Sequence, residues 1–132
     1  MILVDTSLWI DALIDPDRLP ETTARITDFA VCGPIVQEVM QGLDMRNPAS
    51  AALSYAFLAL PKLSDPLPLE LYLEAASIYN DGRRRGLTIR SGADCLIAAI
   101  AIHHDVELWH RDRDFTRIAR YTRLKAVSKY LT

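Results

Sequence analysis

The chain has 132 residues, of which 50% are hydrophobic and 24% are charged, and its net charge is −2. This length fits one domain, and a chain so apolar with so little net charge is not expected to be disordered. Two cysteines, Cys32 and Cys95, are too few for a disulfide scaffold, and their apolar neighbours predict buried free thiols in a reducing cytosol. No secretory signal precedes the first apolar run, and the longest such run, 95–102, is too short for a membrane span. We therefore expect residues 1–132 to form a single soluble, cytoplasmic domain.

The charges are distributed unevenly along the chain. Residues 1–82 carry 4 Lys and Arg against 12 Asp and Glu, whereas residues 83–132 carry 11 against 5. An acidic first part and a basic last part can hold a cation and a polyanion side by side. The two parts can equally intermix on a neutral surface, so charge alone leaves both interpretations open.

Short β-rich runs alternate with stretches of helical apolar spacing, and Pro or Gly separates most of them. The first half predicts, in order, a strand at 2–4, a helix through 8–13 capped by Thr6 or Ser7, a helix at 20–29, a strand at 30–32, and helices at 34–42 and 48–60. The second half predicts a brief strand at 62–63, helices at 68–85 and 92–104, a strand at 107–109, a helix at 112–121 and a strand at 124–127. This alternation predicts an α/β fold with a parallel sheet covered by helices on both faces.

Three carboxylates directly follow predicted strands. Asp5 comes after the first strand, and Asp112 and Asp114 come after the strand at 107–109. Functional residues of parallel sheets gather at the carboxyl ends of the strands, so these three belong to the expected functional edge. For Asp5 alone, a helix N-cap is the simpler interpretation.

Two further carboxylates stand among apolar neighbours. Glu38 lies in the helix at 34–42, and Asp94 lies in the first turn of a helix that is apolar on all sides. Taken singly, Glu38 can mark the polar side of an amphipathic helix, and Asp94 can favour its helix dipole. Several carboxylates in one crevice would repel each other unless a cation compensated, and oxygen ligands without His or Cys suit Mg²⁺ or Mn²⁺.

Four blocks of the sequence resemble the signature blocks of the PIN domain, and most of all those of the VapC toxins of prokaryotic toxin–antitoxin pairs. The blocks are ILVDTS at 2–7, PIVQEVMQG at 34–42, RSGADCLIAA at 90–99 and HRDRDF at 110–115. They occur in the family's order and spacing and span nearly the whole chain. One block would be weak support, whereas four in register are specific.

The resemblance implies a three-layer α/β/α sandwich and a Mg²⁺-dependent endoribonuclease, with Mn²⁺ as a possible substitute, that cuts structured RNA such as tRNA or ribosomal RNA through a metal-activated water. It implies that Asp5, Glu38, Asp94 and Asp112 hold the metal and that Asp114 is a supplementary catalytic acid. Thr6 and Ser7 would orient carboxylates or metal-bound water. Which carboxylate serves as general base stays open.

His110 departs from the family, which often has Thr or Ser at this position. Two interpretations remain open: a hydrogen-bond donor to the site or to the scissile phosphate, and a partly exposed histidine at a strand end.

Arginines are the candidates for holding RNA, because the planar guanidinium binds two phosphate oxygens at once. The candidates are Arg83, Arg84, Arg85, Arg90, Arg111, Arg113 and Arg117, with Arg120 and Arg123 beyond them. For each of them a solvated helix face is the alternative interpretation.

The resemblance also implies a VapB-like antitoxin partner and a homodimer, with exposed apolar positions of the helices at 9–13 and 48–60 as candidate contacts. Alternatives are a PIN nuclease of RNA processing or decay and a PIN module that binds RNA or protein without cutting. A receiver or phosphatase domain is disfavoured, because Ser7 stands where such a phosphatase needs a second Asp and Lys125 lies within its strand.

Overall fold

Four short parallel strands form the centre of the structure, a computed structural model that describes residues 1–14 and 26–129. The strands are β1 (Ile2–Val4), β2 (Phe29–Ala30), β3 (Glu107–His110) and β4 (Lys125–Ser128). Their order in the sheet is β2-β1-β3-β4, and each neighbouring pair is parallel. The chain moves from β1 to β2 on one side and from β3 to β4 on the other, so β1 and β3 flank the switch point at which α/β sheets bind ligands.

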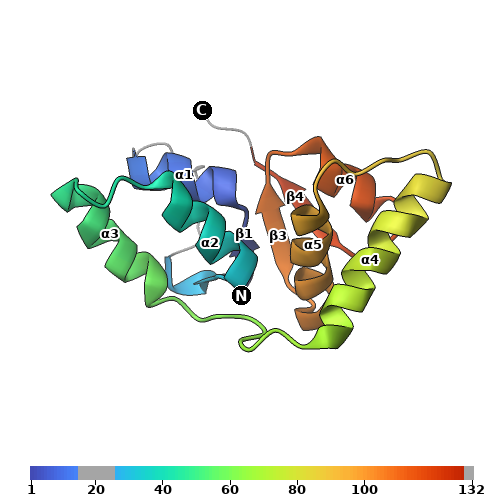
Figure 1. The fold of residues 1–132 in the computed structure, drawn as a ribbon, viewed down its shortest axis with the longest axis horizontal. Coiled ribbons are helices and arrows are strands. Elements are labelled where there is room, and N and C mark those ends of the chain that lie inside the picture. The colour runs from blue at the N-terminus through green and yellow to red at the C-terminus, as the bar shows by residue number, and fades with distance from the viewer. Residues whose placement is uncertain (15–25, 130–132) are drawn as a thin grey trace.

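Within residues 1–14 and 26–129, seven helical segments connect and flank the strands. They are α1 (Thr6–Ile14), the 3₁₀ helix η2 (Ile26–Asp28), α2 (Gly33–Gly42), α3 (Pro48–Leu58), α4 (Leu69–Arg84), α5 (Gly92–His104) and α6 (Arg113–Ala119). Figure 1 shows α1, α2 and α3 on one side of the β1–β3 pair and α4, α5 and α6 on the other. The expected parallel sheet flanked by helices is confirmed.

Helix α5 is buried along its middle turns. Ile97, Ala98 and Ile100 are fully inaccessible to solvent, as the uniformly apolar sequence predicts. The helix ends where Asp105 adopts a left-handed conformation with φ of 53°, which terminates the helical hydrogen bonding. Asp94 lies in the first turn of this helix and is half-buried.

Both cysteines are free and buried, as expected. Burial raises the pKa of the Cys32 thiol to about 12 and that of Cys95 to about 11, so neither is a reactive thiolate at neutral pH. In the described part of the chain, none of the helices has the length and apolarity needed to cross a membrane.

The predicted helix at 20–29 appears over 26–28 only as the 3₁₀ helix η2 and is wrong at Phe29, while its part before residue 26 lies outside the described residues. Phe29 begins β2 because it pairs with Ile2 and its ring packs edge-on against Trp9 at 5.7 Å. The strand predicted at 30–32 ends at Ala30. Val31 continues it only as an isolated parallel bridge to Lys62, which is all that forms of the brief strand predicted at 62–63.

Two smaller expectations about α1 are also corrected. Thr6 and Ser7 lie inside the helix rather than capping it, because the Asp5 carbonyl already accepts the backbone N–H groups of Leu8 and Trp9. Trp9 and Leu13 lie in the core, at 4% and 9% exposure, and do not offer an apolar surface to a partner. On α3, by contrast, Tyr55 is 75% exposed.

Candidate active site

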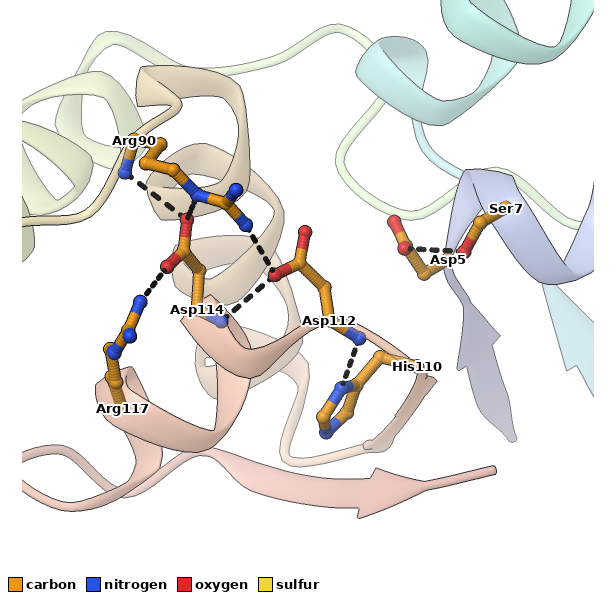
Figure 2. A network of polar contacts seen from close by, with 7 residues as sticks. All are labelled: Asp5, Ser7, Arg90, His110, Asp112, Asp114 and Arg117. Carbon is orange, nitrogen blue, oxygen red and sulfur yellow. Dashed lines mark hydrogen bonds and ion pairs between the residues drawn. The ribbon is translucent and has the colours of Figure 1, made fainter. Parts of the chain in front are cut away.

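Asp5 stands at the carboxyl end of β1, at the switch point of the sheet. Its backbone N–H donates to the Trp109 carbonyl at 2.9 Å, which holds it beside β3. The Ser7 hydroxyl donates to Oδ2 of Asp5 at 3.2 Å (Figure 2). Burial raises the pKa of Asp5 to about 6, against the opposing hydrogen bonds of Thr6 and Ser7, and the nearby charges of Glu38 and Asp112 raise it further.

Asp112 follows β3 and faces Asp5 across the switch point (Figure 2). It is the N-cap of α6, since its Oδ1 accepts the backbone N–H of Asp114 at 2.9 Å. Its own backbone N–H donates to Nδ1 of His110 at 3.1 Å. One hydrogen bond therefore holds the backbone of Asp112 and the other holds its carboxylate, while the side chain remains 33% exposed.

His110 is buried behind Asp112 rather than partly exposed. Its side chain is 1% exposed, its ring lies 5.4 Å from that of Phe115, and its Nδ1 accepts from Asp112. Burial lowers the pKa of His110, so the ring is neutral at physiological pH. The interpretation of His110 as a partly exposed histidine at a strand end is therefore wrong. Its Nδ1 accepts the backbone N–H of Asp112, so His110 supports Asp112.

Asp114 is a buried carboxylate held by two arginines. Its side chain is 1% exposed, and Oδ1 accepts from Nη1 of Arg117 at 2.7 Å. Oδ2 accepts from the backbone N–H of Arg90 at 3.1 Å and from its Nε at 3.4 Å (Figure 2). Both oxygens are thus engaged by donors.

Asp94 completes an acidic cluster with Asp112 and Asp114. One carboxylate oxygen from each of the three lies within 4.8 Å of the others. Burial raises the pKa of Asp94 to about 7, and the charges of the neighbouring carboxylates, Asp5 foremost, raise it further. Glu38, on α2, is close enough to contribute to this effect at both Asp5 and Asp94. The structure therefore brings all five predicted carboxylates into one electrostatic neighbourhood.

The donor set fits a hard divalent cation. Three carboxylate oxygens converge within 4.8 Å, and among the described residues no donor hydrogen-bonds to the Asp94 carboxylate. The Thr6 hydroxyl, beside Asp5, is buried and has no partner among the described residues. The charges of Asp5, Glu38 and Asp112 all oppose ionisation of Asp94, and a site made of oxygen ligands alone suits Mg²⁺ or Mn²⁺.

A polar pocket of about 430 Å³ adjoins the acidic cluster. Its lining consists of Ser7, Arg90, Arg111, Asp112 and Arg113. Three of the predicted RNA-binding arginines thus face the same space as a carboxylate of the cluster, an arrangement that suits a phosphate next to a metal.

The other predicted arginines have different surroundings. Arg117 is bound to Asp114, at the side of the cluster. At the end of α4, Arg83 stacks on Tyr79, Arg84 pairs with Asp81 and Arg85 stacks on Tyr121. These local contacts do not involve the acidic cluster, and α4 ends at the outer edge of the molecule in Figure 1.

Sequence reasoning missed Asp11. On α1, its Oδ2 lies 2.5 Å from Nη1 of Arg111, so this pair ties the helix that follows Asp5 to the loop that carries Asp112. It also missed that Arg90 and Arg117 serve Asp114. Arg117 follows Asp114 by three residues, and this helical spacing could have predicted their ion pair. Arg90 is 24 residues from Asp114, so no local spacing indicated that contact.

Comparisons with known proteins agree with this geometry. A model of the PIN domain matches residues 2–121. Ribonuclease VapC11 of Mycobacterium tuberculosis is 40% identical to the chain over 137 residues, which cover 97% of this chain and 98% of that protein. A VapC ribonuclease of Mycobacterium bovis matches to the same extent.

Two solved structures share the fold. VapBC2 from Rickettsia felis, bound to a DNA fragment from its promoter, superimposes with a TM-score of 0.68 and 17% identity, covering 98% of this chain and 100% of that one. FitAB bound to the IR36 DNA fragment gives a TM-score of 0.68 and 20% identity, covering 97% and 94%. The chain therefore belongs to the PIN-domain family. Its identity to the mycobacterial proteins places it in the VapC branch of that family.

Proposed function

We propose that this protein is a metal-dependent endoribonuclease toxin that hydrolyses phosphodiester bonds in structured RNA, such as tRNA or ribosomal RNA. The observation that carries the proposal is the cluster of Asp94, Asp112 and Asp114 beside a pocket lined by three arginines. The relatives in M. tuberculosis and M. bovis, 40% identical over nearly their whole length, are named ribonucleases. A binding module that does not cut RNA would have no use for carboxylates that repel one another at this edge.

Asp5, Glu38, Asp94 and Asp112 are the proposed holders of Mg²⁺ or Mn²⁺. When bound, a divalent ion supplies an activated water and neutralises charge on the scissile phosphate. Asp114 has both oxygens engaged by arginines, so we assign it the task of fixing Asp112 and Arg90. Ser7 orients Asp5 through its hydroxyl.

In the metal-free protein, burial and the neighbouring carboxylates raise the pKa of Asp94 to about 7, so a bound cation would be needed to keep this proposed ligand ionised near neutral pH. Arg90, Arg111 and Arg113 bind RNA phosphates in the adjoining pocket, because a guanidinium matches the geometry of a phosphate. Base-specific readout would require loop nucleotides splayed away from the helix.

We also propose an antitoxin partner of the kind present in VapBC2 from R. felis. Leu69, Tyr72 and Leu73 form an apolar stripe on α4 with 72%, 50% and 63% exposure. A groove of about 670 Å³ beside this stripe is lined by Tyr72, Leu96 and Glu38 among others. A partner segment with apolar residues and one basic side chain would bury the stripe and reach the carboxylate.

The partner is tested by co-expression with the protein encoded by the neighbouring gene. We expect a stable complex that Tyr72→Glu weakens at least tenfold, while Tyr55→Glu on α3 does not. Equal binding by both variants would place the contact elsewhere. Sedimentation of the isolated chain tests the homodimer expected for the family.

The nuclease is tested by incubating total RNA with the purified protein in Mg²⁺ or Mn²⁺ and, separately, in EDTA. Asp5→Asn is the inactivating variant, and Asp44→Asn, at an exposed surface pair with Arg46, is the matched control. We expect discrete cuts that need the metal, disappear with Asp5→Asn and persist with Asp44→Asn. Cleavage that survives Asp5→Asn or EDTA would overturn the proposal, and a folded protein that binds RNA but cuts none would favour the binding module.

A further inference from the structure

Arg90 is bound to two of the acidic residues in two unequal ways. Oδ2 of Asp114 accepts both its backbone N–H at 3.1 Å and its Nε at 3.4 Å, and Asp114 is 1% exposed. Oδ1 of Asp112 accepts only from Nη2, at 3.4 Å, and Asp112 is 33% exposed. Figure 2 shows the guanidinium lying between the two carboxylates. The arginine is therefore anchored at Asp114 and only lightly held at Asp112.

The contact with Asp112 uses an oxygen of the acidic cluster. Oδ1 of Asp112 already accepts the backbone N–H of Asp114 at 2.9 Å, so the guanidinium is its second donor. A divalent cation at Asp94 and Asp112 would repel a guanidinium at this position and remove the charge that attracts it. Because the contact is single, long and solvent-exposed, it is the one that a cation would break.

The released guanidinium has a place to go. Arg90 lines the 430 Å³ pocket together with Arg111 and Arg113, and its side chain is 73% exposed. The backbone hydrogen bond to Asp114 keeps the residue in position while the guanidinium swings. In the pocket, its planar donors can bind an RNA phosphate bidentately.

We propose that Arg90 is an RNA-binding residue with two alternative partners, and that this alternation couples metal binding to RNA binding. It pairs with Asp112 while the acidic cluster lacks a cation, and it turns to an RNA phosphate when a cation is bound. This inference rests on the proposed nuclease function and adds an order to it: the cation frees the arginine that the substrate needs. By reciprocity, RNA that captures Arg90 strengthens cation binding by the same factor.

The first test measures Mn²⁺ binding to the RNA-free protein by electron paramagnetic resonance. Arg90→Gln removes the competitor of the cation, so we expect it to bind Mn²⁺ three- to tenfold more tightly than the wild type. Arg113→Gln removes the same charge from the same pocket without touching Asp112, and we expect a change of less than twofold. Equal tightening by both variants would reduce the effect to net charge and overturn the proposal.

The second test measures binding of a fluorescein-labelled 20-nucleotide RNA hairpin by anisotropy, with Ca²⁺ as the cation and with EDTA. We expect Ca²⁺ to strengthen hairpin binding by the wild type at least fivefold and by Arg90→Gln less than twofold. Arg90→Lys keeps the positive charge but loses the planar guanidinium that binds two phosphate oxygens. Its strengthening by Ca²⁺ should lie between those of the wild type and Arg90→Gln. The same Ca²⁺ effect in wild type and Arg90→Gln would overturn the coupling, and thermal unfolding confirms that each variant is folded.

Failure of the inference and failure of the nuclease proposal give different results. If the wild type binds Mn²⁺ and Asp94→Asn abolishes it, but Arg90→Gln binds no more tightly, the metal site stands and the role of Arg90 falls. If Mn²⁺ binding is absent from the wild type, or unaffected by Asp94→Asn, the metal site itself is wrong and the inference falls with it.

Discussion

The backbone N–H of Asp114 donates to Oδ1 of Asp112 at 2.9 Å, while the Asp114 carboxylate is bound by Arg90 and Arg117. Two acids separated by one residue therefore have different tasks. Asp112 keeps an accessible carboxylate for the site, and Asp114 is a buried support that fixes its neighbours. The two residues should respond differently to the loss of charge.

Asp114→Asn is expected to lower the free energy of unfolding by about 1–3 kcal/mol, because a buried charge-assisted network loses one partner. The two arginines remain partly exposed and can be hydrated, which limits the loss. Asp112→Asn is expected to change stability by no more than about 0.5 kcal/mol, since Asn also caps helices well, yet to abolish cleavage. Urea unfolding and the RNA cleavage assay measure both. Equal loss of stability in the two variants would contradict this division of tasks.

Asp94 predicts a pH-dependent penalty in the metal-free protein. Its pKa rises from the ordinary value of 3.8 to about 7 in the folded state, so the folded protein retains a proton that the unfolded chain loses. The contribution of the protonated Asp94 to the free energy of unfolding is fully present below pH 3.8. It is lost as the pH rises towards 7. Relative to Asp94→Asn, the wild type should thus become less stable across this window. Because Asp94 is only half-buried and solvent screens part of the effect, we expect a loss on the order of 1–3 kcal/mol at pH 8 in EDTA.

Urea unfolding of wild type and Asp94→Asn at several pH values tests this penalty. Saturating Mg²⁺ at pH 8 should narrow the gap, because only the wild type gains stability from binding the ion. A difference between the two proteins that does not vary from pH 4 to pH 8 would show that burial does not perturb Asp94.

His110 is expected to be neutral throughout the pH range in which the protein is folded and active. It is 1% exposed and its Nδ1 accepts a hydrogen bond, so the proton of the neutral ring resides on Nε2. Nitrogen-15 chemical shifts of the imidazole should report the Nε2–H tautomer at pH 6.0 and at pH 8.0. A signal of protonated imidazole at pH 6.0 would mean that His110 is a titrating group of the site after all.

The pair between Asp11 and Arg111 predicts an effect on cleavage with little effect on stability. Asp11 is 15% and Arg111 37% exposed, so the pair itself contributes at most about 1 kcal/mol. Asp11→Asn would release the loop of Asp112 from α1, and we expect about tenfold slower cleavage at saturating RNA. Asp44→Asn, which breaks an exposed pair, controls for loss of a surface charge. Undiminished cleavage by Asp11→Asn would show that the pair does not position the site.

Sequence patterns predicted the helices and strands that contain a continuous apolar run or that begin and end at Gly, Pro or a polar residue. Helix α5 spans 92–104 as expected, because the apolar run 95–102 lies between a glycine at the start of the helix and Asp105, which ends it. Phe29 was misplaced in a helix because its strand conformation depends on pairing with Ile2 and packing on Trp9, contacts that helical spacing does not encode. The local spacing of apolar residues does not indicate which distant element an aromatic ring will contact.

The same distinction applies to the site. The positions of Asp5 and Asp112 at strand ends were predictable, because parallel strands deliver their carboxyl ends to one edge. The burial of His110 and of Asp114 was not, since it depends on Phe115 and on an arginine 24 residues earlier in the chain. The carboxylates of the proposed site could be named from sequence, whereas the contacts that hold them in place required the fold.

The most direct test of the account is the chemistry of the cut. Once the cleavage site is mapped in a target RNA, an oligonucleotide carrying a single 2′-deoxy nucleotide on the 5′ side of that bond is incubated with the protein and Mg²⁺. Hydrolysis directed by the acidic cluster does not use the 2′-hydroxyl, so the account predicts cleavage of this oligonucleotide and products with 5′-phosphate and 3′-hydroxyl ends. Failure to cut it, together with 2′,3′-cyclic phosphate ends on the all-ribose RNA, would contradict the account.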